Sequence, residues 1–165
     1  MNRNNYNCIS FILRNPQAVA VLNGSEQYPN IYGIVRFYTM ENGTLVYADV
    51  SGLPYADNEC SQEIFGFHIH EGESCTGNAE DSFADTGTHL DMDNSRHPFH
   101  TGDFPSLFGN NGKAVSVFLT NRFSVSEVIG KTIVIHGSPD DIITQPSGNS
   151  GKKIACGIIR PVRRI

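Results

Sequence analysis

The stretch EIFGFHIH, residues 63–70, combines the pattern of a strand with the ligands of a metal site. Phenylalanine or isoleucine occupies every second position from 65 to 69, which is typical of a β-strand with one apolar face. His68 and His70 then share the opposite face, with their Cα atoms about 6.5–7 Å apart. Two imidazoles at that spacing can bind one metal ion through different ring nitrogens, although an isolated pair of this kind is more often exposed to solvent.

Comparable short apolar runs, separated by Gly, Asn, Asp and Pro, recur along the chain and predict an all-β protein. We expect the other strands over residues 18–22, 31–39, 44–50, 114–119, 132–136 and 155–159. Ser124 and Glu127 have the spacing of a capping box and predict one helical turn. Residues 71–113 and 137–153 are polar, and the first segment is too long for an ordinary connection, which indicates a functional loop. Seven or eight short strands with two long loops predict a Greek-key sandwich or a flattened barrel.

The size and charge of the chain narrow the class of protein. Its 165 residues fit one domain, which we place at residues 17–165 after a polar, poorly patterned extension at residues 1–16. The net charge of −5 argues against nucleic-acid binding. No apolar stretch approaches the ~20 residues of a membrane span, and the cluster Ile9–Leu13 is too short for a signal peptide. We therefore expect a cytoplasmic protein that binds neither nucleic acid nor membranes.

All six histidines of the chain lie in these predicted strands and loops. His89, His97 and His100 follow one another in the long loop, which also holds Asp103, and His136 ends a late apolar run. Three imidazoles with one carboxylate suit tetrahedral zinc, whereas a nitrogen-only set suits copper. Each histidine alone could be an ordinary surface residue, but six gathered in this way favour two neighbouring metal sites.

Five motifs follow one another along the chain: GFHIHE at 66–71, GTHL at 87–90, HTGD at 100–103, HGSPDD at 136–141 and GNSGKKIACG at 148–157. Together they resemble the copper-binding, bridging-histidine, zinc-binding and C-terminal signatures of the copper–zinc superoxide dismutase family. The resemblance covers residues 17–160 approximately, and the motifs stand in the order that the family has.

This resemblance implies an eight-stranded Greek-key β-barrel, an immunoglobulin-like sandwich with a long metal-binding loop and an electrostatic loop. It also implies copper and zinc as cofactors, superoxide as the substrate and, as is usual in the family, a homodimer. By position, the copper ligands would be His68, His70, His89 and His136, and the zinc ligands would be His89, His97, His100 and Asp103. Asp140 would accept hydrogen bonds from His68 and His97 and so fix the orientation of both rings.

Two positions depart from the family pattern. Only Pro98 and Phe99 separate His97 from His100, where the family usually has several more residues, so it stays open whether both rings reach zinc. Lys153 stands where the family generally has an arginine that guides the anion to copper. Lysine keeps the positive charge but lacks the planar fork of a guanidinium, so we expect steering to survive with looser docking.

The four cysteines fall into two groups. Cys75 and Cys156 match the intrasubunit disulfide of the family, although from their spacing alone two free buried thiols are an equal alternative. A cross-link over so long a loop would stabilise the fold by about 4.5 kcal/mol in the chain-entropy model. Cys8 and Cys60 match no position of the family, and they could pair or stay reduced.

The resemblance thus predicts the disproportionation of superoxide by copper that cycles between one-electron states. His89 would supply protons as its bond to copper breaks and forms again, and Lys153 would attract the anion. A copper-binding or copper-delivery module without turnover is the main alternative, followed by a zinc-stabilised structural domain. A zinc hydrolase with Glu71 or Glu73 as general base is a weaker hypothesis, because the sequence has no helical HExxH pattern.

Overall fold

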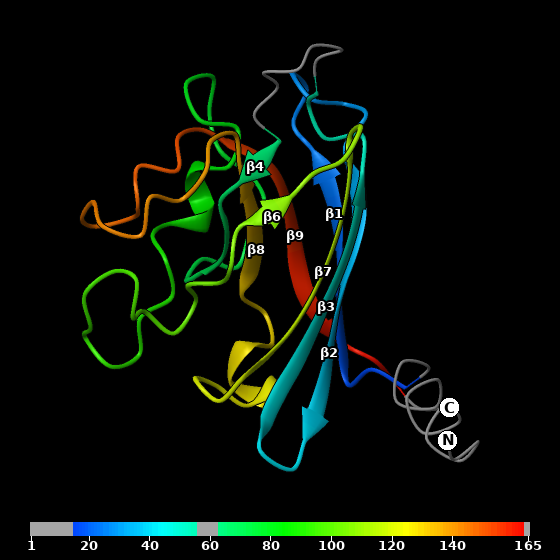
Figure 1. Ribbon diagram of the computed structural model, residues 1–165, viewed down its shortest axis with the longest axis vertical. Helices are drawn as coiled ribbons and strands as arrows, with labels where there is room; N and C mark the ends of the chain where they lie inside the picture. Colours follow the sequence, from blue (N-terminus) through cyan, green and yellow to red (C-terminus); the bar gives the residue numbers. More distant parts are fainter. Residues whose placement is uncertain (1–14, 56–62, 164–165) are drawn as a thin grey trace.

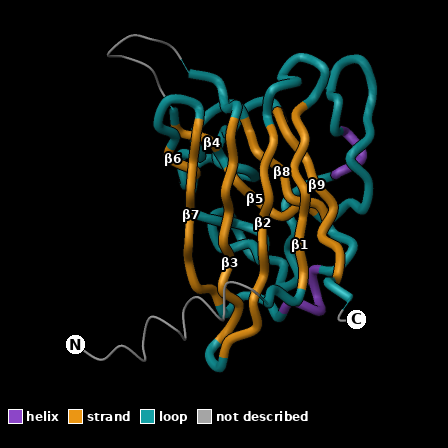
Figure 2. The backbone as a smooth tube through the Cα atoms, turned by 90° about the vertical axis from the view of Figure 1, so that its right-hand side faces the viewer, coloured by secondary structure: helices purple, strands orange, loops and turns teal. Residues whose placement is uncertain are grey.

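Seven strands form one curled antiparallel sheet (Figure 1). The computed structural model describes residues 15–55 and 63–163. The strands are β1 Ala18–Gly24, β2 Tyr32–Met40, β3 Gly43–Ser51, β4 Ile64–Phe65, β5 Phe67–His70, β6 Leu107–Phe108, β7 Lys113–Thr120, β8 Thr132–His136 and β9 Lys153–Pro161. The large sheet has the order β5-β8-β9-β1-β2-β3-β7, and β4 pairs with β6. The sheet curls so that β1, β2, β3 and β7 lie in front of β5 and β8 in Figure 2, and the predicted all-β Greek-key class is confirmed as this half-barrel.

Helical structure is confined, within the described residues, to two short 3₁₀ turns, η1 Ala84–Thr86 and η2 Val125–Val128. The second is the turn that the sequence predicts, because Glu127 accepts hydrogen bonds from the backbone N–H and the hydroxyl of Ser124. Neither turn has the length or the apolar character that a membrane-crossing helix needs.

The predicted strand over residues 63–70 is divided in two at Gly66. Its N–H donates to the Ser138 carbonyl, and its own carbonyl accepts from the His136 N–H, each at 2.8 Å. A Cβ at Gly66 would lie 2.8 Å from the Ser150 side chain, so only glycine fits this close crossing of two segments. A further difference is β6, which lies inside the predicted 71–113 loop and is too short to show alternation in the sequence.

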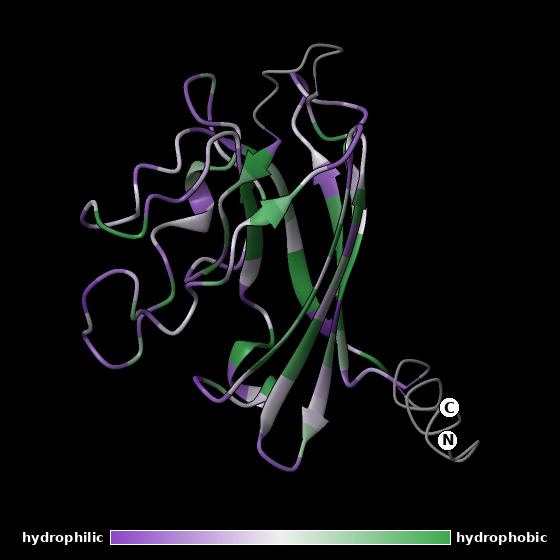
Figure 3. Cartoon of the chain, viewed as in Figure 1, coloured by the Kyte–Doolittle hydropathy of each residue, from purple (hydrophilic) through white to green (hydrophobic). Residues whose placement is uncertain are grey.

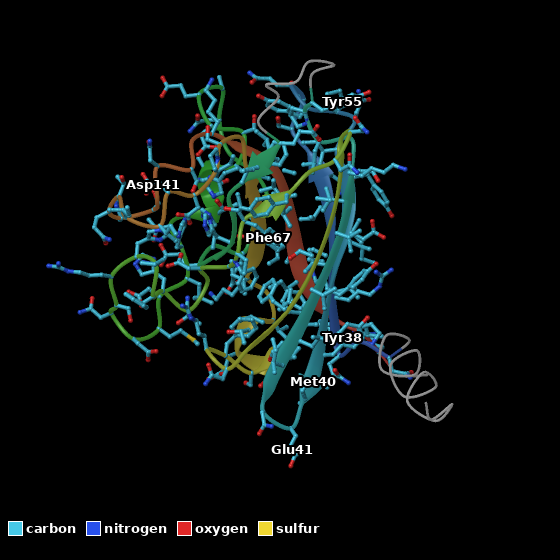
Figure 4. All side chains as sticks on the ribbon, in the orientation of Figure 1. Tyr38, Met40, Glu41, Tyr55, Phe67 and Asp141 are labelled. Atoms are coloured by element: carbon cyan, nitrogen blue, oxygen red, sulfur yellow. A yellow bond between two sulfur atoms is a disulfide. The ribbon has the colours of Figure 1, made fainter. Side chains whose placement is uncertain are left out.

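Strand β5 separates the hydrophobic core from a polar cluster. Phe67, labelled in Figure 4, and Ile69 are fully buried in the core. The ring centroids of Phe67 and Phe104 lie 5.4 Å apart. His68 and His70 lie on the other face and are also buried. The two long loops cover that face, and they are mostly hydrophilic whereas the strands carry most of the apolar residues (Figure 3). The predicted extension at residues 1–16 falls almost wholly outside the described residues, as do Cys8 and Cys60.

Candidate metal centre

Six histidines from three segments meet beside β5. His68 and His70 belong to β5, and His136 ends β8, which pairs with β5 along its whole length. The other three come from the loop that follows β5, and this loop is fastened to the free edge of the strand. The Ile69 N–H donates to the Gly102 carbonyl at 2.9 Å, and isolated bridges join His70 to His89 and His68 to Asp103. The loop therefore covers an edge strand and at the same time brings its histidines against the pair on β5.

The first cluster contains only imidazole nitrogens. His68, His70, His89 and His136 each offer one ring nitrogen, and the four nitrogens lie within 4.8 Å of one another. The Nε2 atoms of His70 and His136 approach to 3.2 Å. His68 Nδ1 and His89 Nε2 are buried and have no hydrogen-bond partner in the described part of the chain. Four convergent nitrogens of this kind suit copper.

The second cluster shares His89 and adds a carboxylate. His89 Nδ1 lies 2.7 Å from Asp103 Oδ1, while the Nδ1 atoms of His97 and His100 lie 3.1 and 3.2 Å from Asp103 Oδ2. These two Nδ1 atoms are buried, and despite their approach to Asp103 neither makes a hydrogen bond within residues 15–55 and 63–163. Three nitrogens and one carboxylate, all within 4.8 Å, are the donors of a closed tetrahedral zinc site.

The short spacing between His97 and His100 does not keep these two rings apart. The Phe99 N–H donates to the Arg96 carbonyl at 2.7 Å and closes a tight turn between them. The His100 N–H donates to Asp103 Oδ2 at 3.0 Å. The turn brings both rings to the same carboxylate despite the short spacing.

Asp140 contacts one histidine of each cluster. Its Oδ2 accepts a hydrogen bond from His68 Nε2 at 2.7 Å, and its Oδ1 accepts one from His97 Nε2 at 2.9 Å. Both Nε2 atoms therefore carry the proton, and the lone pair of each ring is on Nδ1, which faces its cluster.

Hydrogen bonds to backbone carbonyls orient two rings of the nitrogen-only cluster in the same way. His70 Nδ1 donates to the Gly87 carbonyl at 3.0 Å, and His136 Nδ1 donates to the Gly151 carbonyl at 3.2 Å. Their Nε2 lone pairs therefore point at each other and at the cluster. His89 differs from these rings, because its Nδ1 faces one cluster and its Nε2 faces the other. His89 could therefore offer one ring nitrogen to each of the two metal clusters.

The charge state of the site also suits metal binding. Burial lowers the pKa of His68 to about 4, although its hydrogen bond to Asp140 opposes this shift. Burial, together with the nearby His68 ring, lowers the pKa of His136 to about 3. Burial by itself would raise the pKa of Asp140, but its hydrogen bonds from His68 and other donors outweigh this and lower it to about 2. Neutral imidazoles and ionised carboxylates are the forms that bind cations. With buried nitrogens that lack partners, the site fits one copper and one zinc ion.

A cavity of about 330 Å³ gives access to the nitrogen-only cluster. Its lining includes His70, His89, His136, Thr88, Pro146, Gly151 and Lys153. The ammonium of Lys153 is not free, because it donates to Asp81 Oδ2 at 2.9 Å and to the Phe83 carbonyl at 3.1 Å. A positive charge therefore lies at the wall of the cavity, and a carboxylate partly offsets it.

Two residues that sequence patterns do not reveal shape the loop. Arg122, just after β7, donates through one Nη1 atom to the carbonyls of Pro98, His100 and Asp103 at 3.0–3.2 Å. Gln145 pairs with the backbone of His97 by accepting from its N–H at 3.1 Å and donating to its carbonyl at 2.7 Å. Neither belongs to a motif, since each acts on backbone atoms far away along the chain.

Cys75 and Cys156 form a disulfide, which confirms the pairing that the resemblance implies. Their Cα atoms lie 5.7 Å apart, and 81 positions separate them in the sequence. The bond ties the beginning of the long loop to β9, three residues after Lys153.

Comparison with known proteins agrees with this geometry. The family model described as copper/zinc superoxide dismutase matches residues 31–159. Cu-Zn superoxide dismutase 2 of Aquifex aeolicus is 31% identical over 143 residues, which are 79% of this chain and 80% of that protein. The Cu-Zn superoxide dismutase of Deinococcus radiodurans is 31% identical over 155 residues, with 83% and 81% covered. That of Photobacterium leiognathi is 34% identical over 111 residues, with 59% and 64% covered.

Proposed function

We propose a division of roles among the residues of this chain, which belongs to the copper–zinc superoxide dismutase family and is a superoxide dismutase. The observation that carries the proposal is the connection of a nitrogen-only cluster to a zinc-type cluster through the two nitrogens of His89. His68, His70, His89 and His136 would hold copper, and His89, His97, His100 and Asp103 would hold zinc. Copper, when bound, supplies the one-electron chemistry by which two superoxide ions and two protons become O₂ and H₂O₂.

His89 is the residue best placed to move a proton. Its Nε2 has no protein partner and lies in the cluster that the cavity reaches. Its Nδ1 is held on the other side, beside Asp103. The ring can therefore take up a proton at Nε2 and give it to an oxygen species in the cavity without changing its orientation.

Lys153 attracts the superoxide anion, because its ammonium places a positive charge at the cavity wall. This local charge has to outweigh the net charge of −5 of the whole chain. Steering by local charge changes association rates by about 10–10³-fold. For Lys153 we expect an effect at the low end of this range, because the carboxylate of Asp81 partly offsets its charge. Lys153→Ala should lower kcat/KM about 10-fold and weaken its dependence on salt, with copper still bound. Lys152→Ala is the control, because this neighbouring side chain does not line the cavity of about 330 Å³ beside the nitrogen-only cluster. An unchanged rate in Lys153→Ala would exclude the steering role.

The test of the whole proposal is superoxide decay, followed by stopped flow on protein reconstituted with copper and zinc. We expect a rate near the diffusion limit, about 10⁹ M⁻¹s⁻¹. His136→Ala should lose this activity and keep zinc, because His136 is not in the zinc cluster. Slow decay at full copper occupancy would instead favour a copper-binding module without turnover.

A homodimer and a cytoplasmic location remain predictions. The homodimer follows from what is usual in the family, and sedimentation velocity at micromolar concentration tests it. Fractionation of the source cells, with the redox state of Cys75 and Cys156 measured in each fraction, tests the location. A disulfide that persists in the cytoplasmic fraction would be unusual for that compartment.

A further inference from the structure

The side chain of Lys153 lies between two cavities. One is the metal-side cavity, which His70 and His136 line. The other, of about 360 Å³, lies beyond it and is lined by Glu80, Asp81 and Lys152 among others. Lys153 lines both cavities, and its side chain is only 15% exposed. A lysine has a long, flexible stem, so where its charge acts depends on what holds the ammonium.

Asp81 provides that hold. Its Oδ2 accepts from Lys153 Nζ at 2.9 Å, and the Phe83 carbonyl accepts a second N–H from the same ammonium at 3.1 Å. Two of the three N–H directions are therefore occupied by protein oxygens. One N–H of the ammonium has no hydrogen bond among the described residues, and the two fixed bonds determine where it points.

The carboxylate is itself fixed in place. Asp81 Oδ1 accepts from the Phe83 N–H at 2.9 Å, and the Asp81 N–H donates to Asn78 Oδ1 at 3.0 Å. Phe83 is buried and packs against Val134 and the disulfide cysteine Cys156. A rigid turn therefore presents Asp81 to Lys153, although 72 positions separate the two residues in the sequence.

The contact has two effects on an incoming anion, and they have opposite signs. The negative charge of Asp81 weakens the attraction at long range, whereas its hydrogen bond holds the ammonium in the wall that the two cavities share. A lysine without this acceptor could place its charge farther out in the outer cavity or in solvent. The planar guanidinium of an arginine is preorganised to bind a small anion at two points. The ammonium of a lysine sits on a flexible stem, so its position depends more on a hydrogen-bond acceptor that holds it.

We propose that Asp81 is a positioning residue that fixes the ammonium of Lys153 in the wall between the two cavities, so that its charge acts on an anion in the metal-side cavity. This rests on the proposed steering role of Lys153 and extends it. It predicts that loss of the acceptor oxygen of Asp81 weakens anion binding, although the protein then has one negative charge fewer.

The test compares three variants of the full chain, loaded with copper and zinc. Asp81→Ser removes the carboxylate acceptor of Lys153, so that only the Phe83 carbonyl holds the ammonium. It leaves a hydroxyl that can accept the Phe83 N–H, so the turn is kept. Asp81→Asn removes the charge and keeps an oxygen within reach of Lys153. Glu80→Gln removes the same charge one position away, where the structure shows no side-chain contact with Lys153. The readouts are kcat/KM for superoxide and the affinity for azide, a small anion, measured by titration of the copper(II) absorption.

We expect Asp81→Ser to lower both quantities about 5-fold, while Glu80→Gln raises them less than about 2-fold. Asp81→Asn should restore both to the wild-type level or above. If Asp81→Ser instead matched Glu80→Gln, or had the same effect in a Lys153→Ala background, Asp81 would only offset charge and the proposal would be wrong. Azide affinity that falls in Asp81→Ser supports the proposal even if wild-type turnover is slow, so failure of the dismutase function is distinguishable from failure of this inference.

Discussion

The copper and zinc clusters share His89, but the chain builds them by different means. Copper ligands His68, His70 and His136 lie on paired strands, where the register of the sheet sets the position of each Cα atom. The ligands of zinc lie in one irregular loop, whose shape depends on contacts such as those of Arg122. The ladder of the sheet thus holds the first site, whereas a few backbone bridges to β5 and several side chains hold the second. We therefore expect the zinc site to be the more sensitive of the two to single polar substitutions.

The largest expected effect comes from the disulfide, which ties the loop to the sheet. Cys75→Ser should lower the free energy of unfolding by about 4.5 kcal/mol, because it opens a closed loop between positions 81 residues apart. Urea denaturation of the metal-free protein measures this difference. Ser74→Ala is the control, since it changes the same exposed segment and leaves the cross-link intact. Zinc affinity should fall more than copper affinity, and an equal loss of both would contradict the contrast between loop and strand.

Removal of the carboxylate that joins the two clusters should affect both metals. In Asp140→Ala, His68 and His97 lose the acceptor that fixes their rings. Loss of such a partner lowers metal affinity by about 10–100-fold, so we expect losses in this range at each site. Competition with chelators of known affinity measures them. Asp141→Ala is the matched control, because this neighbouring carboxylate lies out on the loop and accepts hydrogen bonds from Ile143 and Thr144 instead (Figure 4).

Arg122→Ala should have the smallest effect and the most selective one. It removes three hydrogen bonds to the loop that holds His97 and His100, so we expect zinc affinity to fall about 10-fold. Copper affinity should change less than about 3-fold. Arg122 contacts only the loop, so the hydrogen bonds between β5 and β8 that position His68, His70 and His136 stay intact. Arg96→Ala, an exposed arginine in the same loop, should change neither. Equal losses of copper and zinc in Arg122→Ala would show that the two clusters do not differ in how they are held.

Glycines mark the positions where the site tolerates no side chain. Gly148 has φ +64°, a left-handed conformation that favours glycine. A Cβ at this position would also collide with the Asp140 carboxylate and with His97. The sequence shows a glycine inside a motif here, but the reason for it becomes visible only when residues 140 and 148 are seen in contact.

Local pattern was enough to predict most strands and to single out the six histidines and Asp103 as candidate ligands, whereas the resemblance assigned them to two metals and made His89 common to both. Alternation in residues 63–70 indicated which face of the strand is apolar, because side-chain direction in a strand depends only on position. The resemblance supplied the pairing of Cys75 with Cys156 and the place of Asp140. The break at Gly66 and the two-residue strand β6 were beyond prediction, since each depends on a partner segment that is remote in the sequence.

The sequence by itself determined which residues can bind metal and in what order they occur, because ligand chemistry belongs to residue types and strand faces follow a period of two. The tertiary structure decided which nitrogen of each ring faces a metal, since that depends on acceptors such as Gly87 and Asp140. It also decided that His97 and His100 converge despite their short spacing, and that Lys153 is paired with Asp81. These outcomes depend on contacts between distant segments, and such contacts exist only when the whole curled sheet has formed.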